Sequence, residues 1–222
     1  MKTKAIVLLS AGLDSTVNLY AAQKNHDVVL ALTFDYGQKA APKEKQQSQK
    51  ICEELNIAHK VVELPFFKDF TSTSLIKEDA EIPTQDKVNI QSKETSEQTA
   101  KQVWVPNRNG IFLNIAAGFA EGLGAEYIIP GFNAEEAVTF PDNSKDFLNQ
   151  SSVALTFSTQ NKVKVHCYTI YMTKAEIVGF GKELEVNFDL IWPCYFSNET
   201  LCGECESCLR YKRALKDMGH AI

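Results

Sequence analysis

AIVLLSAGLDSTVN, residues 5–18, is the stretch of this sequence that decides the fold. Residues 5–9 are apolar without interruption, Ser-Ala-Gly follows, and residues 14–23 have a helical pattern, which together predict a buried strand, a tight loop and a helix. Backbone N–H groups at the start of such a helix, with the hydroxyls of Ser10, Ser15 and Thr16, can bind phosphate. The lysine of a Walker P-loop is missing, which excludes a conventional kinase or GTPase. The same turn can also serve only as a helix cap.

The alternation of strand and helix continues along the chain. Apolar runs predict further strands at residues 28–34, 60–64 and 127–130, and the intervening patterns predict helices at 43–55, 110–123, 144–155 and 174–184. In the helix at 110–123, one face carries Ile111, Ile115, Phe119 and Leu123. This alternation is typical of an α/β fold with a doubly wound, mostly parallel sheet. Residues 77–102 are polar, and we expect them to form a loop or flap over the core of a single domain, 1–222.

Composition and charge narrow the class of protein. The chain has 222 residues, of which 44% are hydrophobic, and this is enough for one full core. The formal net charge of −5 favours a small-molecule substrate over nucleic acid as the partner. No apolar run reaches the roughly 20 residues that cross a bilayer, so we expect a cytoplasmic protein without a membrane partner. One basic cluster predicts a solvated helix end that complements the helix dipole. It consists of Arg210, Lys212, Arg213 and Lys216.

A cluster of four cysteines lies near the end of the sequence. Its members are Cys194, Cys202, Cys205 and Cys208. Seven residues separate the first from the second, and the last three follow at three-residue intervals in the run CGECESC. Four thiolates at this spacing suit one tetrahedral zinc ion, and Gly203 eases the turn between two of them. Such a site has no open position for water, so we expect a structural zinc module over about residues 190–218. Disulfides are the competing interpretation.

The loop at residues 10–15 resembles the Ser-Gly-Gly-x-Asp-Ser pyrophosphate loop of the N-type ATP pyrophosphatase family. Further motifs follow in the order found in one branch of that family, the 7-cyano-7-deazaguanine synthases of queuosine biosynthesis. They are FDYGQ at 34–38, VPNRN at 105–109, GFN at 131–133, PD at 141–142, and the four cysteines. The resemblance spans about residues 4–216, and its specificity comes from the joint pattern.

This resemblance implies a fold, a reaction and a set of ligands. The fold is the PP-loop fold, which is similar to that of the adenine nucleotide alpha hydrolases. The reaction converts 7-carboxy-7-deazaguanine and ammonia to 7-cyano-7-deazaguanine through an adenylated carboxylate and an amide. ATP is a substrate, Mg²⁺ bridges phosphate oxygens, and free ammonium supplies the nitrogen. A homodimer is also implied.

The resemblance places the nucleotide site on the first loop and the start of the helix after it. This site comprises Leu8, Leu9, Ser10, Ala11, Gly12, Leu13, Asp14, Ser15, Thr16, Val17 and Asn18. Three residues are catalytic candidates. Asp14 is expected to cap backbone N–H groups or to hold Mg²⁺, with capping preferred. Arg108 is a candidate to clamp phosphate or the substrate carboxylate, with a surface salt bridge as the alternative. Lys174, at the start of a predicted helix, is a second candidate cation, with a solvated lysine as the alternative.

The substrate base presents adjacent N–H donors, which one carboxylate can accept in a bidentate manner. Glu135, Glu136 and Asp142 are the candidate acceptors in the loop after the strand at 127–130. Asn133 lies in the same loop, and open α/β sheets bind ligands at such positions. Asp142 can instead be a helix cap.

The chain departs from the family pattern at several positions. Ala11 and Glu136 stand where glycine and aspartate are usual, and the Cβ of Ala11 is expected close to the pyrophosphate. Residues 138–140 are Val-Thr-Phe in place of Ser-Gly-Tyr, and residues 167–169 are Cys-Tyr-Thr in place of Thr-Pro-Leu. The changes around Thr139 and at 167–169 keep open a related ligase that joins a deazaguanine-type acid to another amine. A zinc-stapled module that binds tRNA or a protein without turnover is a third hypothesis.

Overall fold

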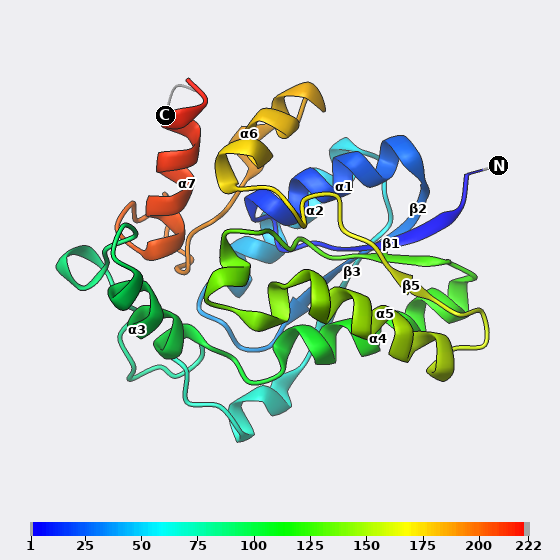
Figure 1. The fold of residues 1–222 in the computed structure, drawn as a ribbon, viewed down its shortest axis with the longest axis horizontal. Helices are drawn as coiled ribbons and strands as arrows, with labels where there is room; N and C mark the ends of the chain where they lie inside the picture. The colour runs from blue at the N-terminus through cyan, green and yellow to red at the C-terminus, as the bar shows by residue number, and fades with distance from the viewer. Residues whose placement is uncertain (1, 220–222) are drawn as a thin grey trace.

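The computed structural model describes residues 2–219 and contains one parallel sheet of five strands. Their order in the sheet is β3-β2-β1-β4-β5 (Figure 1). The strands are β1 (Lys4–Leu8), β2 (Asp27–Asp35), β3 (His59–Glu63), β4 (Tyr127–Ile129) and β5 (Lys164–Val165). Val7 of β1 pairs with Ala31 on one side and Ile129 on the other, so the three central strands end at the same edge. The predicted doubly wound parallel sheet is confirmed.

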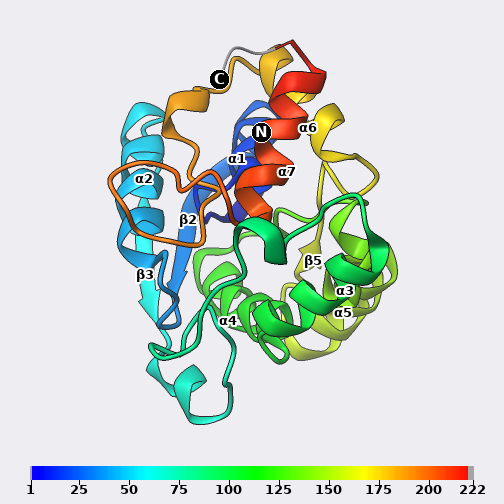
Figure 2. The same cartoon turned by 90° about the vertical axis from the view of Figure 1, so that its left-hand side faces the viewer.

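Helices cover both faces of this sheet. On one face lie α1 (Leu13–Asn25), α2 (Ala41–Glu54) and α6 (Lys174–Glu183), and on the other lie α4 (Arg108–Leu123) and α5 (Lys145–Ser158), as Figures 1 and 2 show. The strand order changes direction between β1 and β4. At such a reversal, the loops after the two strands diverge and leave a crevice at the carboxyl ends of the strands.

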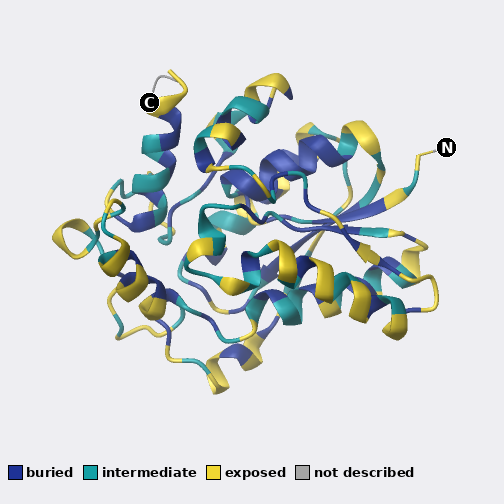
Figure 3. Ribbon diagram, in the orientation of Figure 1, coloured by how far each residue is buried: buried dark blue, intermediate teal, exposed yellow. Residues whose placement is uncertain are grey.

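The core is centred on the sheet, because its inner strands are covered on both faces. Ile6 and Val7 of β1 and Ile128 and Ile129 of β4 are fully buried. Figure 3 shows burial concentrated in the central strands and α1, and exposure on the outer faces of the covering helices. The predicted strands and helices agree with the observed ones to within three residues at each end. The sequence does not predict β5, because two residues give no apolar run.

The polar segment at residues 77–102 is not only a loop. Its second half forms α3 (Lys93–Val103), and one face of this helix is buried, including Ala100 and Val103. The Thr99 hydroxyl donates a hydrogen bond of 2.6 Å to Glu206. The expectation of a loop was wrong for this half, because some of its polar side chains pack against another helix and are not solvated.

The apolar face predicted for α4 is not its most deeply buried face. The side chains packed most closely on the sheet are Leu113, Ala116, Ala117 and Ala120. The predicted stripe is only partly buried along its length, and Leu123 at its end is 44% exposed. Small residues win the inner position because they let the helix approach the strands closely.

The C-terminal helix α7 (Glu206–Asp217) packs against α6. Five short 3-10 turns complete the fold at Pro65–Asp69, Gln85–Lys87, Glu136–Val138, Pro141–Asn143 and Phe188–Leu190. Within the described part of the chain, the helices are too short or too polar to span a membrane.

Candidate active site

A cavity of about 250 Å³ opens at the carboxyl ends of β1, β2 and β4, where the strand order reverses. Its walls come from segments that are far apart in the sequence: the loop after β1, the segment after β2, the start of α4, the loop after β4, the start of α6, residues 192–195 and α7. The tertiary structure thus gathers side chains from both halves of the chain around one space.

The loop between β1 and α1 forms one wall of the cavity. The Ser15 hydroxyl donates to the carbonyl of Gly12 at 3.2 Å and accepts from the N–H of Ser10 at 3.2 Å, which closes the loop on itself. No side chain caps the start of α1, so its first N–H groups are open to an anion. Gly131, at the end of β4, lies against this loop: a Cβ on it would stand 2.5 Å from the Ser15 nitrogen. Only glycine fits there.

Ala11 occupies the strained position of this loop. Its φ of 56° is in the left-handed region, which costs a residue with a Cβ about 1–2 kcal/mol. Ala11 is fully buried, its carbonyl accepts from the Trp192 N–H at 2.7 Å, and it does not line the cavity. The expectation that its Cβ lies beside the pyrophosphate was wrong, because the methyl group is enclosed by protein.

Lys174 lies between two carboxylates at the start of α6. Its Nζ is 2.5 Å from Asp14 Oδ2 and 2.6 Å from Glu136 Oε1, and its side chain is 8% exposed. It is therefore not a solvated lysine. Asp14 caps no backbone N–H of α1, so the expectation of a capping role was wrong. Its second oxygen, Oδ1, is buried and has no hydrogen-bond partner among residues 2–219.

Burial and pairing set the proton affinities of this trio. Burial raises the pKa of Asp14 to about 6, and the charge of Lys174 only partly offsets it. Burial acts on Glu136 in the same direction, but Lys174 outweighs it and lowers the pKa of that carboxyl. Burial acts to lower the pKa of Lys174, and the two carboxylates nevertheless raise it above its ordinary value. The lysine stays charged, and Asp14 is the member that takes up a proton near neutral pH.

The opposite end of the cavity carries charges without a charged partner. Arg108 donates to the Tyr36 hydroxyl at 3.1 Å, and none of the ion pairs among the described residues includes it. Glu44, on α2, accepts from the Gln38 amide at 2.7 Å. Burial raises the pKa of Glu44 to about 7. The surface salt bridge considered for Arg108 is not present.

Glu135 faces α7 and does not line the cavity. Its Oε1 accepts from Arg210 at 2.7 Å and from Arg213 at 2.5 Å. Arg210 also pairs with Glu206 at 2.6 Å, and its side chain is only 13% exposed. The expectation of a solvated basic cluster was therefore wrong for Arg210, because α7 packs this arginine between two carboxylates.

Several predicted site residues lie outside the cavity lining. They are Ala11, Thr16, Val17, Asn18, Asn133, Glu135 and Asp142. Asn18 supports the loop, because its amide donates to the Asp14 carbonyl at 2.8 Å and to Thr169 Oγ1 at 2.6 Å. Asn133 accepts from the Glu136 N–H at 2.8 Å. The remaining predicted residues, Leu8, Leu9, Ser10, Gly12, Leu13, Asp14, Ser15, Arg108, Glu136 and Lys174, do line it.

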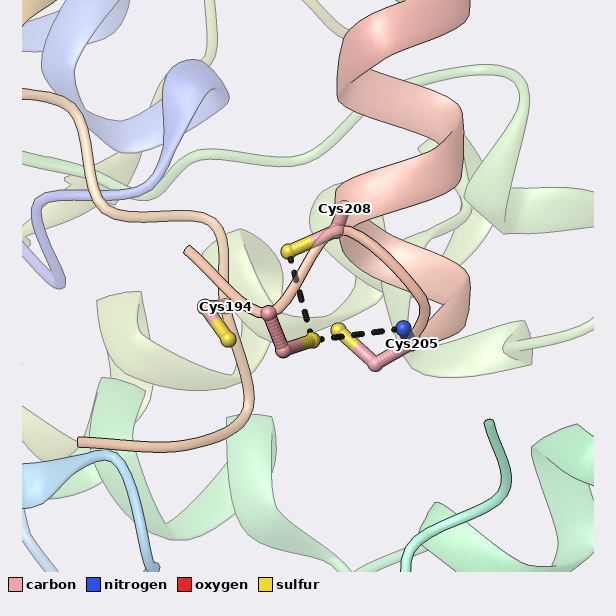
Figure 4. Close-up of side chains that lie close together, drawn as sticks. Cys194, Cys205 and Cys208 are labelled. Atoms are coloured by element: carbon pink, nitrogen blue, oxygen red, sulfur yellow. Dashed lines mark hydrogen bonds between the residues drawn. The ribbon is translucent and has the colours of Figure 1, made fainter. Parts of the chain in front are cut away.

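The four cysteines come together beside this site. All four Sγ atoms lie within 4.8 Å of one another, and the sulfurs of Cys202 and Cys208 are 3.9 Å apart. Bonds of about 2.3 Å in a tetrahedral zinc site place sulfurs about 3.8 Å apart, so the donor set fits. Figure 4 shows Cys194 approaching on a separate segment from Cys205 and Cys208. Gly203 takes a φ of 76°, as the tight turn between ligands requires.

Comparison with known proteins identifies the family. The family model described as "Queuosine biosynthesis protein QueC" matches residues 4–219. The chain belongs to the QueC family. A 7-cyano-7-deazaguanine synthase from Bdellovibrio bacteriovorus is 61% identical over 212 residues, which are 95% of this chain and 92% of that relative. A second, from Carboxydothermus hydrogenoformans, is 54% identical over 95% of this chain and 97% of its own length.

Membership of the QueC family makes this chain an enzyme of queuosine biosynthesis. It argues against the hypothesis of a module without turnover. Among solved structures, NMN synthetase from Francisella tularensis aligns with 100% of this chain and 79% of its own, at a TM-score of 0.52 and 14% identity. A likeness at that identity concerns the fold alone, and it agrees with the PP-loop fold.

The departures from the QueC pattern divide into two groups. Thr139 and Phe140 line the cavity, whereas Cys167 and Thr169 lie behind it and donate to the Phe132 carbonyl at 3.3 and 2.6 Å. Sequence reasoning also missed several lining residues, among them Glu44, Trp192, Tyr195, Glu206 and Arg210. The one signal for Glu44 was its place shortly after the FDYGQ motif.

Proposed function

We propose that this QueC-family enzyme converts 7-carboxy-7-deazaguanine and ammonia to 7-cyano-7-deazaguanine, with cleavage of ATP to AMP and pyrophosphate. The observation that carries the proposal is the cavity, where an open helix start faces two cations, Lys174 and Arg108. Such a site suits the transfer of a nucleotidyl group to a carboxylate, because positioning and charge stabilisation are most of what that reaction needs. The names of the close relatives support the choice of substrate.

The proposed reaction has two activations. A carboxylate oxygen attacks the α-phosphorus of ATP, the bond to the β-phosphate oxygen breaks, and pyrophosphate leaves. Ammonia attacks the acyl carbon, AMP leaves with the former carboxylate oxygen, and one proton passes to a base, which gives the amide. The amide oxygen then attacks a second ATP in the same way. Loss of AMP with that oxygen, and of two protons from the nitrogen, gives the nitrile.

Each charged residue has a task in this scheme. Lys174 stabilises the negative charge that develops on the α-phosphoryl oxygens, which is worth most in a buried site. Glu136 and Asp14 hold its Nζ in place. With a pKa of about 6, Asp14 is also suited to receive a proton near neutral pH. Arg108 binds the substrate carboxylate or phosphate through two parallel N–H donors.

Two metal ions belong to the proposal. Zinc at the four cysteines is structural, because four thiolates leave no open position. Mg²⁺ fits at the Lys174 end, because Asp14 Oδ1 is a buried carboxylate oxygen without a partner among the described residues. Asp14 and Glu136 would hold this ion, which supplies neutralisation of phosphate charge.

The test is turnover with defined substrates. Purified protein is incubated with ATP, Mg²⁺, ammonium and 7-carboxy-7-deazaguanine, and mass spectrometry follows the acid while pyrophosphate is measured. Conversion to the nitrile is the expected result. An adenylate or amide that accumulates without nitrile would point to the related ligase, which the cavity position of Thr139 keeps in view. Consumption of neither substrate would overturn the proposed function.

The metal assignment has its own test. Cys202→Ser should lose zinc and lower the stability of the C-terminal part before it changes the chemistry, because binding free energy at such sites is on the order of 10 kcal/mol and is largely folding energy. Metal analysis and thermal unfolding measure both effects. A variant that stays folded and zinc-loaded but inactive would contradict a structural role. We extend the proposal to a homodimer, which light scattering tests against the chain mass of 24.8 kDa.

A further inference from the structure

One carboxylate of the cavity is free for a ligand. Four carboxylates line the space: Asp14, Glu44, Glu136 and Glu206. The first and third share Lys174, and the fourth is bound by Arg210. Glu44 has only the Gln38 amide on its Oε2, at 2.7 Å, and no hydrogen bond from the described residues reaches its Oε1. This carboxylate therefore has acceptor capacity that the protein itself does not use.

The position of Glu44 is fixed and its surroundings are flat. The Gln38 side chain that holds it donates also to the Phe34 carbonyl at 3.0 Å and accepts from the Tyr36 N–H at 2.9 Å. Phe34 and Phe112, which both line the cavity, stack with ring centroids 4.2 Å apart. A rigid acceptor beside aromatic walls is the combination that recognises a planar heterocycle by its edge.

We propose that Glu44 reads the base of the substrate by accepting from its ring N–H and its adjacent 2-amino group. This inference rests on the proposed function, since it names the recognition residue of that same site. A 2-amino-4-oxo pyrimidine ring offers these two donors side by side, and one carboxylate can take both. Arg108, at the same end of the cavity, supplies donors for the carbonyl and carboxylate oxygens of the same molecule.

The same carboxylate selects against adenine at this end of the cavity. Adenine presents one amino group next to an unprotonated ring nitrogen, so one oxygen of Glu44 would face a lone pair. An unpaired buried acceptor costs more than a lost contact, which is how polar sites reject a close analogue. The loop end of the cavity is then left for the phosphates of ATP.

The environment of Glu44 supports this role. Burial raises its pKa to about 7, Gln38 and the charge of Arg108 act to lower it, and the charge of Asp35 acts to raise it. The carboxyl is thus partly protonated at neutral pH, and two N–H donors from a ligand favour its charged form. Binding of the acid should tighten as the pH rises through 7 and then level off.

The test combines Glu44→Gln with a substrate analogue that lacks the 2-amino group. For the wild-type enzyme, the KM of the acid should rise about 10- to 100-fold when the amino group is removed, as expected for hydrogen bonds to a charged group. Glu44→Gln should raise the KM of the natural acid by a similar factor and should respond less than about threefold to removal of the amino group. The KM of ATP should stay the same. Glu53→Gln, an exposed glutamate of the same helix, is the matched control.

Three results would overturn the inference. They are an unchanged KM of the acid in Glu44→Gln, a raised KM of ATP, which would mean that Glu44 reads adenine, and a loss confined to kcat, which would mean a role in proton transfer. Failure of the proposed function is distinguishable, because the wild-type enzyme itself would then leave the acid unchanged. Equilibrium binding of the acid without ATP gives a second readout that does not depend on turnover.

Discussion

At the α6 end of the cavity the charges are paired with one another, whereas at the α2 end Glu44 and Arg108 have neutral hydrogen-bond partners. Both ends are buried, so the difference has an energetic meaning. Charges in a buried pair hold one another in place without a ligand, while an unpaired buried charge costs stability until a ligand supplies its partner. The comparison teaches that the first end is built to position a charge and the second to recognise a molecule.

The strongest way to break this comparison is Lys174→Met. Two buried carboxylates then lose their common partner, and we expect the free energy of unfolding to fall by about 3–5 kcal/mol. The rate of the chemical step should fall at least about 100-fold, because a charge aimed at the reacting phosphate is gone. Denaturant unfolding and single-turnover kinetics measure the two effects. Lys182→Met, an exposed position of the same helix, should change little. Retention of kcat within tenfold would place Lys174 outside the chemistry.

Gly131→Ala tests whether the loop end depends on close backbone contact. The new Cβ would stand 2.5 Å from the Ser15 nitrogen, so the loop must move. We expect a loss of about 3 kcal/mol in stability and a drop of at least about tenfold in ATP-dependent pyrophosphate release. Gly118→Ala on α4 is the control, because a Cβ there meets nothing within 4 Å and a helix interior gains from alanine. Equal behaviour of the two variants would contradict the contact.

Glu44→Gln sharpens the comparison through stability. In the folded chain the pKa of Glu44 is raised from its ordinary 4.5 to about 7, so the folded state holds a proton that the unfolded chain has lost. Wild-type stability should therefore fall as the pH rises from about 4.5 through 7, and the glutamine variant should lack this fall. Above pH 7 the variant should be more stable by about 2 kcal/mol. Unfolding curves at pH 5 and pH 8 show the difference, and a variant less stable at pH 8 would contradict it.

The smallest expected effect is that of Ala11→Gly. Glycine removes the left-handed strain at φ 56° while the cavity lining stays the same, so stability should rise by about 1 kcal/mol and the KM of ATP should not change. Thermal unfolding measures the gain. Ala21→Gly, in the interior of α1, should lose about as much. A changed KM of ATP would return Ala11 to the cavity wall.

Local patterns predicted the parts of the fold whose partners are local or repetitive. The strand, loop and helix over residues 4–25 follow from an apolar run, two small residues and a helical pattern, and the cysteine spacing indicated the metal cluster. Helix α3 was missed because its polar residues are buried by a helix that lies about 110 positions further along the chain. Arg210 was misjudged for the same reason, since its partners Glu135 and Thr99-bound Glu206 come from the fold and not from its own helix alone.

The sequence by itself determined the class of fold, the family, the loop that faces the phosphates and the cysteine cluster, because strand and helix periods and motif spacings are local. The tertiary structure decided which charges meet. Glu135 and Glu136 are neighbours in the chain, yet one binds the arginines of α7 and the other binds Lys174 in the cavity. Only packing brings Glu44 to the same space from a different helix. The physical reason is that a charge is assigned to a partner by distance and burial, and these are properties of the packed chain and not of the order of its residues.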